Sequence, residues 1–237
     1  MYTDKIVLIT GTSRGVGFEI ANYFLEHNAT VIGMSRGAMT INNINYFHFI
    51  VDLSLPEEII AAFKNISRQH KKIDIVINNA AVLTSQYSMI MPLKNAIDMI
   101  NVDLLAVFLV SRESAKLMRK NSYGRIINIG SMAASLEPEG DSLYAACKVG
   151  INTLANVMAK EFASMNITCN TIAITAIETD MLKQHTTTAQ IKIKEIIKNL
   201  PIPRMAKIED ILNVINFFSS EKSSYITAQI IYLGGIN

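Results

Sequence analysis

Short apolar runs rich in isoleucine and valine recur along this chain, and stretches with the helical spacing of apolar residues separate them. Runs of this length are typical of strands buried on both faces of a parallel sheet. The helical stretches supply the crossovers that parallel strands require. The alternation predicts an α/β protein with about seven strands in a doubly wound parallel sheet, and helices on both faces. The predicted strands are residues 6–9, 30–34, 46–51, 73–77, 125–129, 166–173 and 229–233.

The chain has 237 residues, half of them apolar and 18% charged, which supports one sizeable core. We expect a single domain over residues 1–237, because this length suits one α/β domain and no linker or repeat interrupts the pattern. The net charge is +2, and the basic residues are scattered rather than clustered. The sequence therefore predicts neither a nucleic-acid partner nor a membrane partner.

We expect a cytoplasmic location. Neither of the two cysteines, Cys147 and Cys169, belongs to a C-x-x-C pattern, which fits a reduced compartment. Residues 1–5 lead into the first predicted strand without the pattern of a secretory signal. The longest apolar run, residues 104–110, is too short to span a bilayer.

A glycine-rich segment, T-G-T-S-R-G-V-G at residues 10–17, joins the first predicted strand to a helical stretch at 18–25. Gly11 permits a tight turn, while Gly15 and Gly17 let the backbone approach a pyrophosphate and the neighbouring strand. The start of the helix offers free N–H groups and a positive dipole end to phosphates. Strand, glycine-rich turn and helix in this order predict a dinucleotide site, and a turn without a ligand is the alternative.

The end of the second predicted strand indicates which dinucleotide is bound. An acidic residue about 20 residues past the glycines usually holds the ribose 2′-hydroxyl of NAD. No Asp or Glu lies between Ala29 and Asn45; instead Arg36 follows the strand and Arg14 lies inside the glycine loop. Guanidinium groups suit a 2′-phosphate. We therefore favour NADP(H) over NAD, with two solvated surface arginines as the alternative.

Two further strand ends carry candidate cofactor contacts. Asp52 and Leu53 follow the third strand, where the carboxylate would accept from an adenine amino group or cap the helix that starts near Pro56. Asn79 and Ala80 follow the fourth strand. Small and amide side chains there suit a wall against a cofactor, although an ordinary turn uses the same residues.

The fifth predicted strand leads to Ser131, and ligands bind at the carboxyl ends of parallel strands. Tyr144 and Lys148 lie on a predicted helix over 142–162, where positions four apart share one face. An ammonium beside a phenol stabilises the phenolate, which enables a tyrosine to exchange a proton near neutral pH. Taken alone, this spacing more often marks a packed tyrosine beside a solvated lysine.

Two segments are unusual for their predicted elements. The long helix predicted over 91–120 contains Asn101, which is unfavourable in a helix unless its side chain or a bend gains from it. Residues 181–200 are threonine-rich and then helical, with alternating lysines and isoleucines. This segment is either a lid over the substrate or a plain surface insertion.

Together these motifs resemble the short-chain dehydrogenases/reductases, whose fold is the Rossmann fold. The matching residues follow the family's order and spacing over essentially the whole chain: Thr10-Gly11-x-x-x-Gly15-x-Gly17, Asn78-Asn79-Ala80, Asn101, Ser131 and Tyr144-x-x-x-Lys148. Within the family, the chain is most similar to the 3-oxoacyl-[acyl-carrier-protein] reductases. That similarity rests on residues 11–17, 125–131 and 177–181, and on the Arg204 segment.

The resemblance implies a role for each motif residue. Tyr144 is the general acid, Lys148 promotes its ionisation and binds the nicotinamide ribose, and Ser131 orients the substrate carbonyl. Asn101 supports a water that links Lys148 to solvent. Hydride transfer leaves alkoxide charge on oxygen, for which Ser131 and Tyr144 are two donors. The remaining cofactor contacts implied are Ser13, Arg14 and Val16 in the loop, and Ile177 and Thr179 beside the nicotinamide carboxamide.

The chain departs from the family pattern at three places that concern the substrate. Ile174-Thr175 stands where the family has Pro-Gly, against the nicotinamide. Acyl-carrier-protein reductases carry entrance arginines where this chain has Ser122 and Met165; the nearby basic residues that would substitute are Arg119, Lys120 and Arg125. The loop between Ser131 and Tyr144 holds three acids, Glu137, Glu139 and Asp141. As a rim they would disfavour an anionic carrier, and a solvated turn is the alternative.

The function predicted is NADPH-dependent reduction of a 3-oxoacyl thioester, carried by acyl carrier protein, in fatty-acid or polyketide-type biosynthesis. One alternative is an NADP-dependent dehydrogenase of a small free alcohol, polyol or steroid-like substrate. Another is an NADP-binding protein with little catalysis. The resemblance also implies a homo-oligomer, either tetramer or dimer, formed through the helices of residues 101–120 and 142–162.

Overall fold

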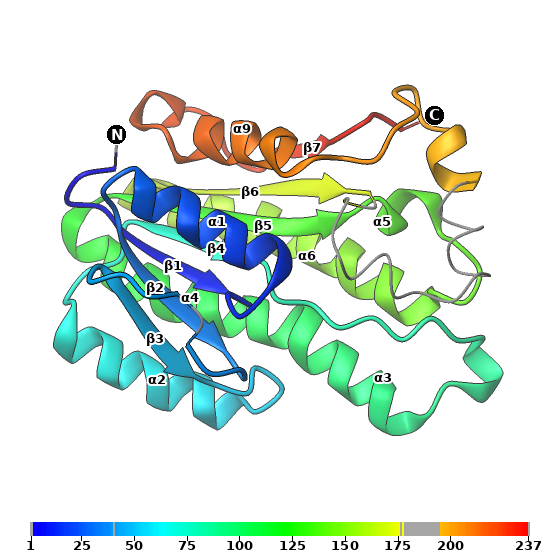
Figure 1. The fold of residues 1–237 in the computed structure, drawn as a ribbon, viewed down its shortest axis with the longest axis horizontal. Helices are drawn as coiled ribbons and strands as arrows, with labels where there is room; N and C mark the ends of the chain where they lie inside the picture. The colour runs from blue at the N-terminus through cyan, green and yellow to red at the C-terminus, as the bar shows by residue number, and fades with distance from the viewer. Residues whose placement is uncertain (1, 40, 176, 178–194, 237) are drawn as a thin grey trace.

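A computed structural model describes residues 2–39, 41–175, 177 and 195–236. Seven parallel strands form one sheet in the order β3-β2-β1-β4-β5-β6-β7 (Figure 1). This order confirms the predicted doubly wound parallel sheet. The strands are β1 (Ile6–Thr10), β2 (Thr30–Ser35), β3 (Tyr46–Ile50), β4 (Ile75–Asn78), β5 (Gly124–Ser131), β6 (Ile167–Ile174) and β7 (Ile230–Tyr232).

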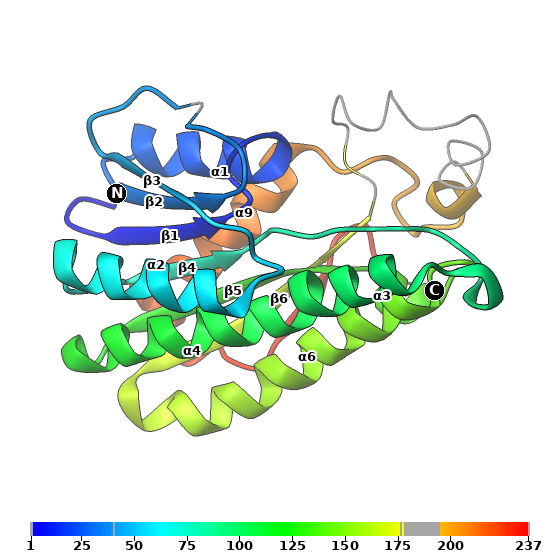
Figure 2. The same cartoon turned by 90° about the horizontal axis from the view of Figure 1, so that it is seen from below.

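Helices cover both faces of the sheet (Figure 2). Alternate side chains of β1 show why this strand is almost entirely apolar: Val7 and Ile9 pack beneath α1 and α9, while Leu8 packs on the opposite face toward α2 and α4. With both faces buried, no polar alternation is expected along a strand. The helices are α1 (Gly15–Glu26), α2 (Pro56–Gln69), α3 (Leu93–Ile100), α4 (Ala106–Met118), α5 (Ala133–Leu136), α6 (Ser142–Phe162) and α9 (Ile208–Ser219).

The long helix predicted over residues 91–120 is interrupted. A π-helical segment, Asn101–Leu105, separates α3 from α4, and a short 3₁₀ turn, Arg119–Asn121, ends the element. A π-helical turn widens the backbone and changes the direction in which later side chains point, and such segments often occur at functional sites. Of the candidate lid at 181–200, residues 181–194 lie outside the described residues, and 195–198 are helical.

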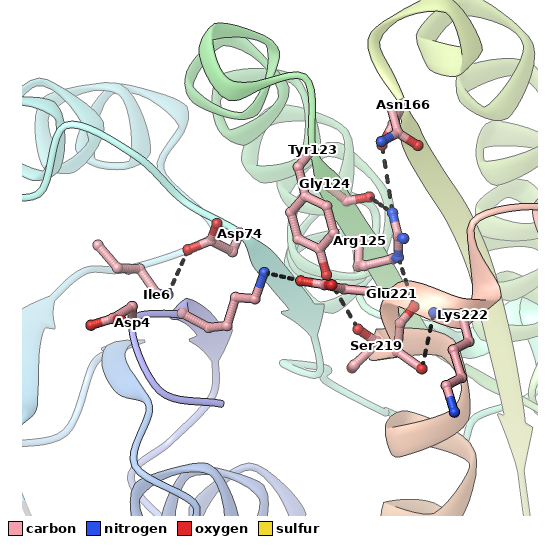
Figure 3. A network of polar contacts seen from close by, with 12 residues as sticks. Asp4, Ile6, Asp74, Tyr123, Gly124, Arg125, Asn166, Ser219, Glu221 and Lys222 are labelled. Carbon is pink, nitrogen blue, oxygen red and sulfur yellow. Dashed lines mark hydrogen bonds and ion pairs between the residues drawn. The ribbon is translucent and has the colours of Figure 1, made fainter. Parts of the chain in front are cut away.

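Buried polar groups hold the amino ends of the central strands together (Figure 3). Asp74, only 4% exposed, precedes β4 and accepts a hydrogen bond from the backbone N–H of Ile6 in β1 at 2.8 Å. The same carboxylate oxygen pairs with Lys72 at 3.0 Å. A buried backbone N–H group needs a hydrogen-bond acceptor, so Asp74 helps to align the amino ends of β1 and β4.

Arg125, at the start of β5, is also inside the protein, with 1% exposure. Its guanidinium donates to the backbone carbonyls of Gly124 at 2.8 Å and Ser220 at 3.3 Å, and it lies 4.5 Å from the centre of the Tyr123 ring. Burial lowers the pKa of Arg125, against the opposing effect of Tyr123. The suggestion that Arg125 receives an acidic carrier is therefore wrong, because the side chain is buried at the amino end of β5, whereas Ser131 lies at its carboxyl end.

Replacing Asp74 tests the importance of this amino-end contact. We expect Asp74→Ala to lower the free energy of unfolding by about 1–3 kcal/mol, because the buried N–H of Ile6 loses its acceptor. Urea denaturation measures the change. Glu221→Ala is the matched control: it removes the Lys5–Glu221 ion pair of 2.7 Å, whose carboxylate is 72% exposed, and should change stability little. Equal losses in the two variants would contradict the assignment.

Candidate active site

The glycine loop between β1 and α1 is held from the neighbouring strand β4. The Asn79 side chain donates to the carbonyl of Thr10 at 3.0 Å, and the backbone N–H groups of Asn79 and Ala80 both donate to the Thr10 hydroxyl at 3.0 Å. Asn79 and Ala80 thus fix the end of β1 where the loop begins. Gly11 and Gly15 have φ of +77° and +61°, a region that glycine adopts without strain.

The loop is shaped as a backbone cradle. A Cβ on Gly17 would collide with the carbonyl oxygen of Gly11, so the start of α1 packs directly on the turn. At Gly15, by contrast, a Cβ would find no atom within 4 Å, which leaves open space in front of the backbone. The N-cap residue of α1, Arg14, makes no side-chain capping hydrogen bond. The backbone N–H groups at the start of a helix, beside an open, glycine-lined space, fit the phosphates of a dinucleotide.

The candidate residues around the adenosine end lie near this cradle. Arg14 and Arg36 are exposed, whereas Leu53 is buried. Asp52 accepts from the backbone N–H of Ser54 at 2.9 Å and from its hydroxyl at 2.7 Å. Burial raises the pKa of Asp52, but these hydrogen bonds and the charge of Arg36 outweigh it, so the pKa is lowered overall. Asp52 does not cap α2, whose N-cap is Leu55 without a side-chain hydrogen bond.

Tyr144 and Lys148 lie one turn apart on α6, as the spacing predicted. The Lys148 ammonium is 5.3 Å from the centre of the Tyr144 ring, and the lysine is only 2% exposed. Its Nζ lies 3.4 Å from the backbone carbonyl of Ile129, two residues before Ser131 in β5. Ser131 is half-buried, and its hydroxyl accepts from the N–H of Ala133 at 3.1 Å. The structure therefore brings α6 and the carboxyl end of β5 together.

The structure separates Asn101 from this group. The Asn101 side chain donates to the backbone carbonyl of Ser54 at 3.1 Å. The polar group beside Lys148 is instead Asp103, whose Oδ1 lies 3.8 Å from Lys148 Nζ, as an ion pair rather than a hydrogen bond. Residues two apart in a helix point away from each other, so only one of the two can face α6.

Asp103 was missed by the sequence reasoning. It is fully buried, and its Oδ1 accepts from the N–H of Val82 at 3.1 Å. Burial raises the pKa of Asp103 to about 6, although the charge of Lys148 and the Val82 hydrogen bond lower it. A carboxylate inside the apolar sequence V-D-L-L-A-V was the available signal, since buried acids are rarely unpaired.

The acidic loop lines a hollow next to the start of α6. A hollow of about 640 Å³ runs along the face of α6 that carries Ala145 and Val149, and Glu137 and Glu139 line it together with Tyr87. Neither Ser131 nor Tyr144 lines it. The loop of residues 81–92 is tied to the acidic loop by hydrogen bonds from the Gln86 N–H to the Gly140 carbonyl at 2.7 Å and from Tyr87 to Glu139 at 3.4 Å.

Comparison with known proteins identifies the family. The model of the short chain dehydrogenases matches residues 5–190. The chain belongs to the short chain dehydrogenase family. It is accordingly an oxidoreductase that uses a nicotinamide cofactor, which the glycine loop fits, and the resemblance noted in the sequence is confirmed. Among the described residues, no helix of this short chain dehydrogenase could cross a membrane and no three metal-ligating side chains gather.

Individual relatives extend over nearly the whole chain. The 3-oxoacyl-[acyl-carrier-protein] reductase of Buchnera aphidicola subsp. Schizaphis graminum is 35% identical over 237 residues, which cover 98% of this chain and 96% of that protein. The aldohexose dehydrogenase of Thermoplasma acidophilum, solved without ligand, has a TM-score of 0.89 at 25% identity over 98% of this chain and 94% of its own. A short chain dehydrogenase of Leptospira borgpetersenii with bound NAD+ has a TM-score of 0.88 at 25% identity, covering 99% and 93%.

The remaining predicted residues that the structure describes lie in the glycine loop or at the carboxyl end of β6 and just beyond it. Ser13 and Val16 are half-buried in the glycine loop. Ile177 is buried and forms an isolated parallel bridge with Ala206, whereas Thr179 lies outside the described residues. Ile174 ends β6 opposite Ser131, and its carbonyl accepts from the N–H of Met132 at 2.9 Å. Thr175 follows it, half-buried, at the carboxyl end of the sheet.

Proposed function

We propose that this short chain dehydrogenase reduces a 3-oxoacyl thioester, bound to an acyl carrier protein, to the 3-hydroxyacyl product with NADPH, in fatty-acid or polyketide-type biosynthesis. The observation that carries the chemistry is Tyr144 stacked on the buried Lys148, with Lys148 anchored on β5 two residues before Ser131. The substrate class is supported by the relative at 35% identity, which is a 3-oxoacyl-[acyl-carrier-protein] reductase.

Each side chain at this edge has its own role in the proposed reaction. The nicotinamide supplies the hydride to the carbonyl carbon when the cofactor is bound. Negative charge then grows on the carbonyl oxygen, and the hydroxyls of Ser131 and Tyr144 are the two donors that stabilise it. Tyr144 gives its proton to this oxygen, which completes the alcohol. The positive charge of Lys148 stabilises the phenolate that remains.

A second candidate function is oxidation of a small free polyol or sugar. The similarity to an aldohexose dehydrogenase favours it, as does the burial of Arg125, which leaves one fewer cation for an acidic carrier. The acids Glu137 and Glu139 beside α6 point the same way, because like charges repel an anionic partner. A catalytically silent binding protein is disfavoured, since Ser131, Tyr144 and Lys148 are all present at one edge of the sheet.

Tyr144→Phe tests the chemistry directly. We expect the variant to lose about 10²-fold or more in kcat for NADPH oxidation with a 3-oxoacyl thioester, because the proton donor is gone, while NADPH binding is kept. Tyr87→Phe is the matched control, since Tyr87 is exposed and lines the neighbouring hollow. Near-normal turnover by the Tyr144 variant would contradict the role. If the wild type turns over a hexose or polyol but neither free nor carrier-bound 3-oxoacyl thioesters, the proposed thioester substrate is wrong and the second candidate function is favoured.

The preference for NADPH is supported by Arg36, which is exposed just past β2 and whose charge lowers the pKa of Asp52. We expect Arg36→Ala to weaken NADPH binding about tenfold or more, because charge-assisted hydrogen bonds to the 2′-phosphate contribute about 1.5–3 kcal/mol. NADH binding should change little. Titrations that follow nucleotide fluorescence measure both, with Arg119→Ala as a control on a distant basic residue. Equal losses for the two nucleotides would remove the basis for NADP.

We also propose a homo-oligomer formed through α6, as expected from the sequence, but with α3 in place of the expected helix at 101–120, because the exposed large apolar side chains lie on α3. Large apolar side chains face outward on both helices, namely Leu93, Ile97 and Ile100 on α3 and Val149 and Val157 on α6. The two helices lie side by side on the same side of the sheet (Figure 2). Outward apolar side chains on adjacent helices form the kind of patch that a second copy of the chain covers.

Substitution on this patch tests the oligomer. We expect the 26.2 kDa chain to run as a dimer or tetramer in light scattering coupled to size exclusion, and Ile97→Lys to dissociate it, because the lysine charge would be buried at the interface. Ile44→Lys is the matched control, since Ile44 is 91% exposed in the loop before β3. A monomeric wild type would contradict the proposal, and so would dissociation by both variants.

A further inference from the structure

Asp103 is a buried charge that the mechanism described so far does not use. It lies in the π-helical segment with no solvent exposure. Its Oδ1 accepts from Val82 and faces Lys148, but its Oδ2 has no hydrogen-bond partner among the described residues. A carboxylate with one oxygen unsatisfied costs stability, and a buried ion pair is often no more stable than an apolar replacement. Its presence therefore calls for a reason other than folding.

The groups that face Asp103 come from α6. Lys148 lies 3.8 Å away, and Cys147 is the other titratable neighbour that interacts with it in the described part of the chain. Burial, and then the charge of Asp103, raise the pKa of the Cys147 thiol, which therefore stays neutral near physiological pH. Lys148 is consequently the group through which the Asp103 charge reaches the active site.

Lys148 lies close to both Tyr144 and Asp103. Its ammonium is 5.3 Å from the centre of the Tyr144 ring and 3.8 Å from the Asp103 carboxylate. Charges inside a protein are screened much less than exposed ones. A negative Asp103 therefore offsets part of the stabilisation that Lys148 gives to the Tyr144 phenolate.

We propose that Asp103 is a positioning residue that moderates the effect of Lys148 on Tyr144 and so keeps the Tyr144 proton in place for carbonyl reduction. This inference rests on the assignment of Tyr144 as the proton donor in the proposed function. Reduction needs the phenol, whereas alcohol oxidation needs the phenolate. The charge of Asp103 therefore biases the site toward the reductive direction at neutral and alkaline pH.

Asp103→Asn tests the inference because it keeps the shape and the acceptor for Val82 but removes the charge. In the protein without cofactor, tyrosinate absorbance is followed against pH, and the signal of Tyr144 is isolated from the eight tyrosines by subtracting the matching Tyr144→Phe protein. We expect the tyrosinate signal of Tyr144 to appear at lower pH in the Asn variant than in wild type, because the charge of Lys148 is no longer offset. Identical ionisation in the two proteins would overturn the inference. This readout needs no substrate, so its failure is distinguishable from an error in the proposed substrate.

A second readout uses the loaded enzyme. The alkaline limb of the reductive pH profile should move to lower pH in Asp103→Asn, and the difference from wild type should vanish below about pH 6, where Asp103 itself is protonated. A uniform loss of rate at every pH would indicate a merely structural role. Asp103→Glu should restore the wild-type profile, and Asp98→Asn, a charge change on α3, should leave it unmoved. If the Asn variant fails to fold, Asp103→Ser carries the same test with a smaller neutral side chain.

Discussion

Burial of the sheet on both faces is the constraint on which the rest of this structure depends. It leaves little room for polar side chains along a strand, so the chemistry moves to the strand ends. In β5 the amino end holds the buried Arg125, and the carboxyl end holds Ser131. One polar pair does lie inside the sheet, where the Asn78 side chain donates to the Asn128 side chain at 2.8 Å. The candidate active site thus lies at the strand ends partly because the buried faces of the sheet leave little room for polar side chains.

The interruption between α3 and α4 contains Asp103, the carboxylate beside the buried Lys148. The other acceptor near that lysine is the backbone carbonyl of Ile129, at 3.4 Å. The π-helical segment turns Asp103 toward that lysine and turns Asn101 toward Ser54. A widened helical turn costs stability, and so does a buried carboxylate. Both costs occur at one place, beside Lys148 and the proposed proton donor Tyr144.

The sequence predicted the layers of the fold well because their signals are local. Burial on both faces makes the central strand β1 almost entirely apolar, and the need for positive φ makes Gly11 and Gly15 glycines. Two other features depend on distant partners. Arg125 is buried by carbonyls that include Ser220, 95 residues away along the chain. The choice between Asn101 and Asp103 depends on helix phase, which a five-residue π-helical segment shifts without a clear sequence signal.

The charged side chains near the carboxyl edge of the sheet indicate more about the substrate than the fold does. Arg119 and Lys120 follow α4 near the start of β5, and the eight residues of β5 put roughly 25 Å between that end and the edge where Ser131 lies. Glu137 and Glu139, by contrast, lie on the Ser131 side beside α6. An acidic carrier that docks at this edge therefore has to approach away from the hollow along α6. A 3-oxoacyl thioester, the substrate proposed above, is neutral, so the acids would oppose an acidic carrier and not the acyl group. They would then affect delivery of the substrate rather than hydride and proton transfer.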